Sequence, residues 1–72
     1  MITAPETPLE TAVRHVAEGE VRVARQKWQV GEMRRDGHLD AALTAEKLLR
    51  SFETTLALAR EHLRKEWQKQ GE

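Results

Sequence analysis

The sequence has no cysteine and no tyrosine, and only two prolines occur among its 72 residues. Without cysteine, a disulfide framework, a thiolate metal site and a thiol nucleophile are all excluded. The prolines, Pro5 and Pro8, lie near the start, so no proline interrupts a helix after them. Aromatic residues are few as well, namely Trp28, Phe52 and Trp67. A chain this short buries only a modest core unless a partner chain adds to it.

An excess of charge of either sign is also missing, because 12 basic residues balance 12 acidic ones. Phosphate binding needs a basic surplus, so this balance argues against nucleic acid as a partner. No apolar run approaches the roughly 20 residues that span a bilayer, and we expect no membrane partner. Residues 1–6 lack a basic region followed by an apolar run, which argues against a secretory signal. We therefore expect a cytoplasmic protein.

Helical signals are what the sequence does contain. Thr7 can cap a helix, Pro8 fits the first helical position, and Glu10 stands where a capping box requires an acid. Gly37 can take the left-handed conformation that ends a helix, and Asp40 offers a second N-cap. These signals predict one domain with a frayed N-terminus at 1–7, a helix over 8–36, a turn over 37–40 and a helix over 41–69.

A heptad pattern of apolar residues runs through both predicted helices and predicts an all-α fold, an antiparallel two-helix hairpin. A connection of three or four residues makes neighbouring helices antiparallel. We call the a and d positions the seam. In the first helix it comprises Leu9, Ala12, Val16, Gly19, Val23, Gln26, Val30 and Met33, and in the second Ala42, Ala45, Leu49, Phe52, Leu56, Ala59 and Leu63.

Folding the chain at Gly37 and His38 aligns seam residues whose numbers add up to 75. Large side chains then face small ones, as Leu56 faces Gly19, which fills layers at constant helix separation. The polar Gln26 within the seam is expected to set the register. The same alignment pairs flanking e positions of opposite charge, namely Lys27 with Glu53, Glu20 with Arg60, and Arg34 with Glu46, and the apolar Val13 with Trp67.

Apolar residues outside the seam indicate self-association. In the first helix they recur at spacings of 4, 3, 4 and 3, which places them on a second face. A lone hairpin leaves these residues in water, so we expect a homodimer or higher oligomer, most simply a four-helix bundle. A different protein partner can use the same face. The expected interface residues are Ala17, Val21, Ala24, Trp28, Gly31, Leu43, Leu48 and Leu58.

Several segments resemble a group of short, uncharacterised alphaproteobacterial two-helix proteins. The segments are residues 14–20 (RHVAEGE), 23–26 (VARQ), 37–38 (GH), 48–49 (LL) and 52–56 (FETTL). The resemblance covers roughly residues 12–63. It implies a bacterial origin and a helical fold. Because these proteins have no known activity, it implies no functional residues.

The candidate chemistry is restricted to histidine. In the predicted register, His15 and His62 fall on the same flank at nearly the same height, with Glu18, Glu61 and Glu66 nearby. Two histidines with carboxylates can bind zinc or another divalent ion. Di-iron bundles use an inward-facing Glu-x-x-His order, whereas His15 precedes Glu18. The opposing interpretation, which we favour, is that both histidines are solvated surface residues.

No other motif supports an enzyme. Ser51 has no histidine and acid placed with it for acyl transfer, and no glycine-rich phosphate loop occurs. We therefore predict no catalytic residues, no cofactor and no metal. The predicted function is a non-enzymatic protein–protein interaction or assembly module that acts as a small homo-oligomer. The alternative is a His/Glu metal-binding helical bundle with His15 and His62 as ligands.

Overall fold

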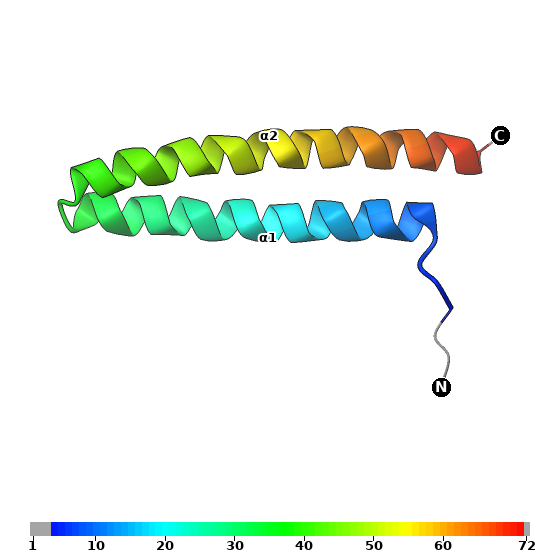
Figure 1. The fold of residues 1–72 in the computed structure, drawn as a ribbon, viewed down its shortest axis with the longest axis horizontal. Helices are drawn as coiled ribbons and strands as arrows, with labels where there is room; N and C mark the ends of the chain where they lie inside the picture. The colour runs from blue at the N-terminus through cyan, green and yellow to red at the C-terminus, as the bar shows by residue number, and fades with distance from the viewer. Residues whose placement is uncertain (1–3, 72) are drawn as a thin grey trace.

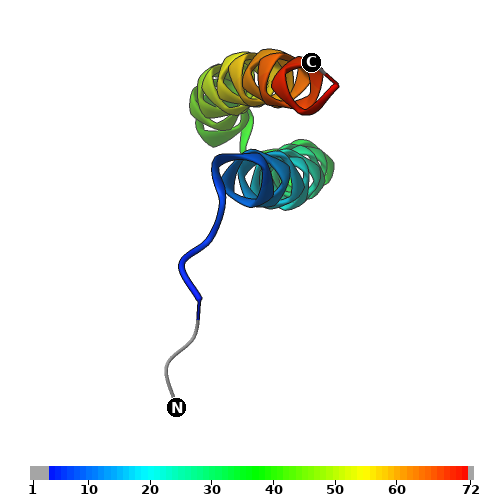
Figure 2. The same ribbon diagram turned by 90° about the vertical axis from the view of Figure 1, so that its right-hand side faces the viewer.

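The computed structural model describes residues 4–71, which form two helices joined by a short turn (Figure 1). Helix α1 spans Pro8–Arg35 and helix α2 spans Leu39–Gln70. The helices lie side by side in opposite directions, and the start of α1 and the end of α2 both lie at the end away from the turn (Figures 1 and 2). The prediction of an all-helical chain with two helices packed against each other is confirmed. Within residues 4–71, neither helix has an apolar stretch sufficient to cross a membrane.

The start of α1 is fixed by the predicted capping box. The Thr7 hydroxyl accepts a hydrogen bond from the Glu10 N–H at 3.1 Å, and the Glu10 carboxylate accepts one from the Thr7 N–H at 3.1 Å. Two N–H groups that have no partner in the first turn are thereby satisfied. The expected fraying over 1–7 falls partly on residues 1–3, which lie outside the described residues. Residues 4–7 are not helical, and Thr7 is held by its cap.

The turn occupies residues 36–38 and is shorter than the predicted 37–40. Gly37 adopts the left-handed conformation with φ 78°. Its N–H donates to the Arg34 carbonyl at 3.1 Å, and the His38 N–H donates to the Met33 carbonyl at 2.8 Å. These bonds satisfy the last carbonyls of α1 and reverse the chain within one residue.

The prediction of Asp40 as the second N-cap is wrong. The N-cap of α2 is His38, whose side chain makes no capping hydrogen bond. Because Gly37 reverses the chain so abruptly, the His38 carbonyl already accepts the first helical bond, from the Ala42 N–H at 2.9 Å. Asp40 lies inside the first turn of α2. Its negative charge there interacts favourably with the positive end of the helix dipole.

Every predicted seam residue is buried or half-buried between the two helices. The predicted facing of Gly19 and Leu56 is confirmed, because a Cβ added to Gly19 would lie 3.0 Å from Leu56 Cδ1. Gln26 is 6% exposed, and its Nε2 donates to the Ala45 carbonyl at 2.9 Å. In a helix that carbonyl lies beside the N–H of Leu49, the residue predicted to face Gln26. The register is therefore the predicted one.

The predicted pairs along the e positions form in part. Arg34 pairs with Glu46, and Arg60 approaches Glu20 at 3.9 Å. Lys27 and Glu53 form no ion pair in the described part of the chain, and Val13 and Trp67 both stay exposed. Exposed pairs contribute little, so burial of the seam carries the stability of the hairpin.

Candidate functional site

The hairpin encloses a thin core. Its buried apolar residues are small or medium in size, namely Ala12, Val23, Val30, Ala42, Ala45 and Leu56, and within residues 4–71 no large side chain is fully buried. Larger apolar residues remain outside, with Trp28 64% and Val21 57% exposed. Large exposed apolar surface on a small protein marks a site of interaction. The exposed faces are therefore the candidate functional site.

The predicted interface residues of α1 lie together on one face. We call Ala17, Val21, Ala24, Trp28 and Gly31 the outer face of α1. All are exposed except Gly31, which is half-buried. Their heptad positions, b and f, lie on the side of the helix opposite the seam, so the outer face points away from α2.

A hollow of about 380 Å³ lies at one end of this outer face. It is lined by Ala17 and Val21 together with the neighbouring side chains of Glu18, Arg22 and Arg25. The floor is apolar because Ala17 carries only a methyl group. The arginine stems extend that apolar surface while their charged ends remain in water. The hollow is a place where an apolar side chain from another molecule can be buried.

The predicted interface residues of α2 are not brought together with this face. Leu58 lines a groove of about 410 Å³ between the helices on one flank, beside His15 and His62. Leu48 lines another groove of about 410 Å³ with Gln26 and Met33. Leu43 lines a separate hollow next to the Arg34–Glu46 pair. One flat contact cannot cover all these residues at once.

His15 and His62 line the same groove, as their predicted height implies. Of the carboxylates expected near them, Glu18 and Glu61 are paired with arginines, and Glu66 is shared between His62 and Lys69. Glu18 accepts from Arg14 Nη1 at 2.8 Å, and Glu66 lies 3.4 Å from His62 Nε2 and 3.0 Å from Lys69 Nζ. Among residues 4–71, no three side chains of the His, Asp or Glu type are gathered closely enough to hold a metal ion.

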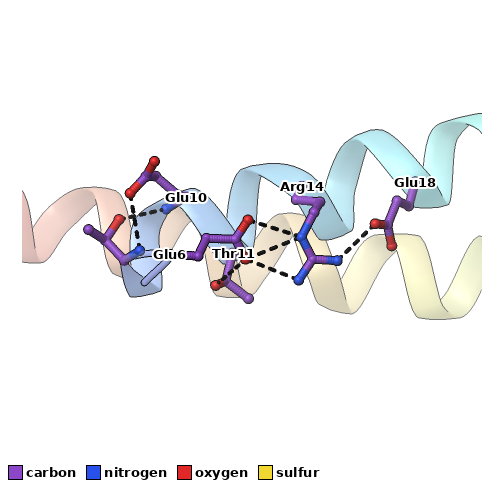
Figure 3. Close-up of polar contacts among 6 residues, drawn as sticks. Glu6, Glu10, Thr11, Arg14 and Glu18 are labelled. Carbon is purple, nitrogen blue, oxygen red and sulfur yellow. Dashed lines mark hydrogen bonds and ion pairs between the residues drawn. The ribbon is translucent and has the colours of Figure 1, made fainter. Parts of the chain in front are cut away.

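A polar cluster ties the segment before α1 to the helix, and Figure 3 shows its members converging on one guanidinium. Arg14 Nε donates to both carboxylate oxygens of Glu6, at 3.2 and 3.1 Å, and Thr11 Oγ1 donates to Glu6 at 2.7 Å. Arg14 also pairs with Glu18. Glu10, one turn before Arg14, takes no part in this cluster because its carboxylate caps the helix instead.

Interactions with Arg14 lower the pKa values of both acids in this cluster. The hydrogen bonds from Arg14, with that of Thr11 second, hold the pKa of the Glu6 carboxyl below its ordinary value. The same guanidinium lowers the pKa of Glu18, and both acids raise the pKa of Arg14. The cluster is thus an electrostatic clamp on the N-terminal segment.

Glu66 was missed by the sequence analysis, which ended the seam at Leu63. It occupies the next d position and is 8% exposed. The hydrogen bond from Lys69 is the main reason that the pKa of Glu66 is lowered, and the charge of His62 adds to it. The sequence did contain the pattern that places Glu66 in the seam. The heptad continues to Glu66, and His62 and Lys69 lie one turn away on either side of it.

Comparisons with known proteins return no match. No family model, no curated protein and no solved structure is significantly similar to this chain. The arrangement described above therefore carries the functional argument.

Proposed function

We propose that this protein is a non-enzymatic protein–protein interaction module that works as a small homo-oligomer. The simplest form is a dimer of hairpins in which four helices make up the assembly, the four-helix bundle predicted above. The supporting observation is the imbalance between the core and the surface. The buried apolar residues are mostly alanine and valine, whereas both tryptophans are about two-thirds exposed.

Energetics favour such an assembly. Each fully buried side chain of the size of leucine or tryptophan contributes about 1.5–3 kcal/mol relative to leaving it in water. A domain of this length has a net stability of only a few kcal/mol. Burying Trp28, Val21 and their neighbours against another chain therefore adds an amount comparable to the stability of the hairpin itself.

Analytical ultracentrifugation of the purified chain over a wide concentration range tests the proposal. We expect a species of twice the chain mass at concentrations of about 10–100 μM, the range typical of a small helical interface. A chain that sediments as a monomer throughout this range contradicts homo-oligomerisation. Circular dichroism on the same samples verifies that the chain is helical in either case.

A further inference from the structure

Side-chain size alternates along the outer face of α1. Val21 and Trp28 are large and more than half exposed, whereas Ala17, Ala24 and Gly31 are small. A surface of this kind fits a second surface in which small residues stand opposite large ones. The face supplies both kinds of residue at helical spacing, so a second copy of the same face is a complementary partner.

Antiparallel pairing of two such faces produces matched layers. When Trp28 of one copy stands opposite Ala17 of the second copy, Val21 stands opposite Ala24. Both layers occur twice, because a two-fold axis relates the copies. The axis then passes between residues 22 and 23, close to the midpoint of Pro8–Arg35, so the two α1 helices overlap along nearly their full length.

The hollow described above lies where this pairing needs it. It is lined by Ala17 and Val21, and the indole of Trp28 from the second copy would be placed over Ala17. Buried aromatic side chains that fill a pocket are the usual energetic centres of protein interfaces. Arg25 at the rim also suits a tryptophan, because guanidinium groups stack favourably on indole faces.

Charge complementarity across the two-fold axis also suits this pairing. Glu20 and Lys27 occupy neighbouring e positions beside the outer face, and both are exposed. In the antiparallel arrangement Glu20 of one copy lies beside Lys27 of the second copy, and two-fold symmetry repeats the pair. Helical side chains lean toward their own N-termini, which shortens the remaining axial offset between these two residues. In a parallel arrangement the e positions of one copy lie instead beside the c positions on the opposite flank of the second copy, so the size match of the layers, and not the charges, sets the direction.

We propose that a second copy of this chain occupies the outer face of α1, packed antiparallel through the same face. Trp28 of each copy fills the hollow over Ala17 of the other, and Glu20 pairs with Lys27 across the axis. This inference rests on the proposed function and specifies the contact that makes the dimer. The α1 helices form the central pair and the α2 helices lie on the outside, so the four helices lie in a row, and this contact replaces the compact four-helix bundle as the form of the dimer.

Truncation of the tryptophan tests the anchor. Trp28→Ala is expected to weaken dimerisation at least about tenfold, measured by sedimentation equilibrium. Trp67→Ala is the matched control, because Trp67 is equally exposed, at 67% against 64%, but lies on a flank near the end of α2. It is expected to leave the dimer dissociation constant within about twofold. Equal weakening by both variants, or by neither, overturns the proposed contact.

Cross-linking tests the direction of the pairing. The chain has no cysteine, so an equal mixture of Val21→Cys and Ala24→Cys chains forms only engineered disulfides. Random pairing of an equal mixture already gives twice as much mixed product as either homodimeric product, and the antiparallel layers predict a mixed product well above that twofold ratio. Parallel pairing predicts mainly products between identical chains, and that result overturns the inference. Ser51→Cys with Thr54→Cys is the control, because these exposed residues lie at the same heights on α2.

Exchanging the charges of Glu20 and Lys27 tests their pairing. Because the test compares single and double variants, it does not depend on the folding of any one of them. Glu20→Lys alone and Lys27→Glu alone place like charges together and are each expected to weaken dimerisation severalfold. The double variant restores the pair and is expected to recover at least half of that loss on a logarithmic scale. Double-variant affinity no better than the weaker single variant overturns the pairing.

Failure of this inference and failure of the proposed function are distinguishable. A wild-type dimer that is unaffected by Trp28→Ala and gives no 21–24 cross-link overturns the outer-face contact and leaves self-association standing. A monomeric wild-type chain overturns both proposals, even if its outer face binds a different protein.

Discussion

Two glycines within α1 show how one residue type meets different surroundings. A Cβ at Gly31 would meet only the Arg35 guanidinium, at 3.8 Å, whereas a Cβ at Gly19 would lie 3.0 Å from Leu56 Cδ1. Glycine in a helix costs about 1 kcal/mol relative to alanine. At Gly31 a substitution by alanine recovers this cost of about 1 kcal/mol, because the added Cβ has room. At Gly19 the gain is opposed by displacement of a buried leucine.

The two alanine substitutions should therefore differ. We expect Gly31→Ala to raise the free energy of unfolding by about 0.5–1 kcal/mol and Gly19→Ala to leave it unchanged or lower it. Urea denaturation monitored by circular dichroism measures both. A gain at Gly19 equal to the gain at Gly31 would show that the close approach of α2 at Gly19 costs nothing.

The clamp at Glu6 predicts a dependence on pH. Its folded pKa lies below the ordinary value for glutamate because the hydrogen bonds from Arg14 favour the carboxylate. A lowered pKa means that the contribution of Glu6 is present above the unfolded pKa and is lost as the pH falls through the folded pKa. Acidification through the folded pKa of Glu6 should therefore release residues 4–6, while the Thr7 cap and the helices persist.

NMR titration of the Glu6 side-chain carboxyl measures this midpoint. Arg14→Gln should return the midpoint to the ordinary glutamate range of about 4.3. A Glu6 midpoint that does not move in the variant would mean that the guanidinium does not hold the N-terminal segment in solution.

The two helices differ in how their N-termini are satisfied. Helix α1 begins at a complete capping box, whereas the His38 side chain caps nothing at the start of α2. Loss of a capping oxygen costs about 0.5–2 kcal/mol.

We expect Thr7→Ala to lower the free energy of unfolding by about 1 kcal/mol and His38→Asp to raise it by a similar amount. Thermal unfolding followed by circular dichroism checks both directions. The same sign for the two variants would contradict the difference between the caps.

The helices and their register could be predicted from the sequence because the signals were local or periodic. Thr7 and Glu10 carry the capping box within four residues, and the heptad places Gly19 against Leu56. The N-cap of α2 could not be assigned in this way. Two hydrogen bonds from Gly37 and His38 back to α1 decide where α2 begins, and they depend on the three-dimensional path of the turn.

The surface was harder to predict than the seam. Arg14 has several acids within reach, and it pairs with Glu6 and Glu18 because Glu10 is already engaged in the cap. The exposed apolar residues could be identified by exclusion from the seam. Their distribution over separate faces, with Leu48 and Leu58 on a flank and Trp28 on the outer face, follows from the orientation of each helix around its own axis.

Self-association should also appear in the thermal behaviour of the whole molecule. When folding and dimerisation are linked, the unfolding midpoint rises with protein concentration. We expect a measurable rise in the midpoint over a hundredfold range of concentration for the wild-type chain and a much smaller one for Trp28→Ala. Differential scanning calorimetry provides the measurement. A midpoint independent of concentration in the wild-type chain would be the signature of a hairpin that folds alone.

The start of α1 and the end of α2 lie at the same end of the hairpin, opposite the turn (Figure 1). In the antiparallel dimer proposed above, the open end of each copy therefore lies beside the turn of the other. The helix of 28 residues separates the two pairs of termini by about 42 Å. A domain attached to one copy and a domain attached to the other would be held at opposite ends of the dimer and kept apart. The length of α1 would set the distance between them.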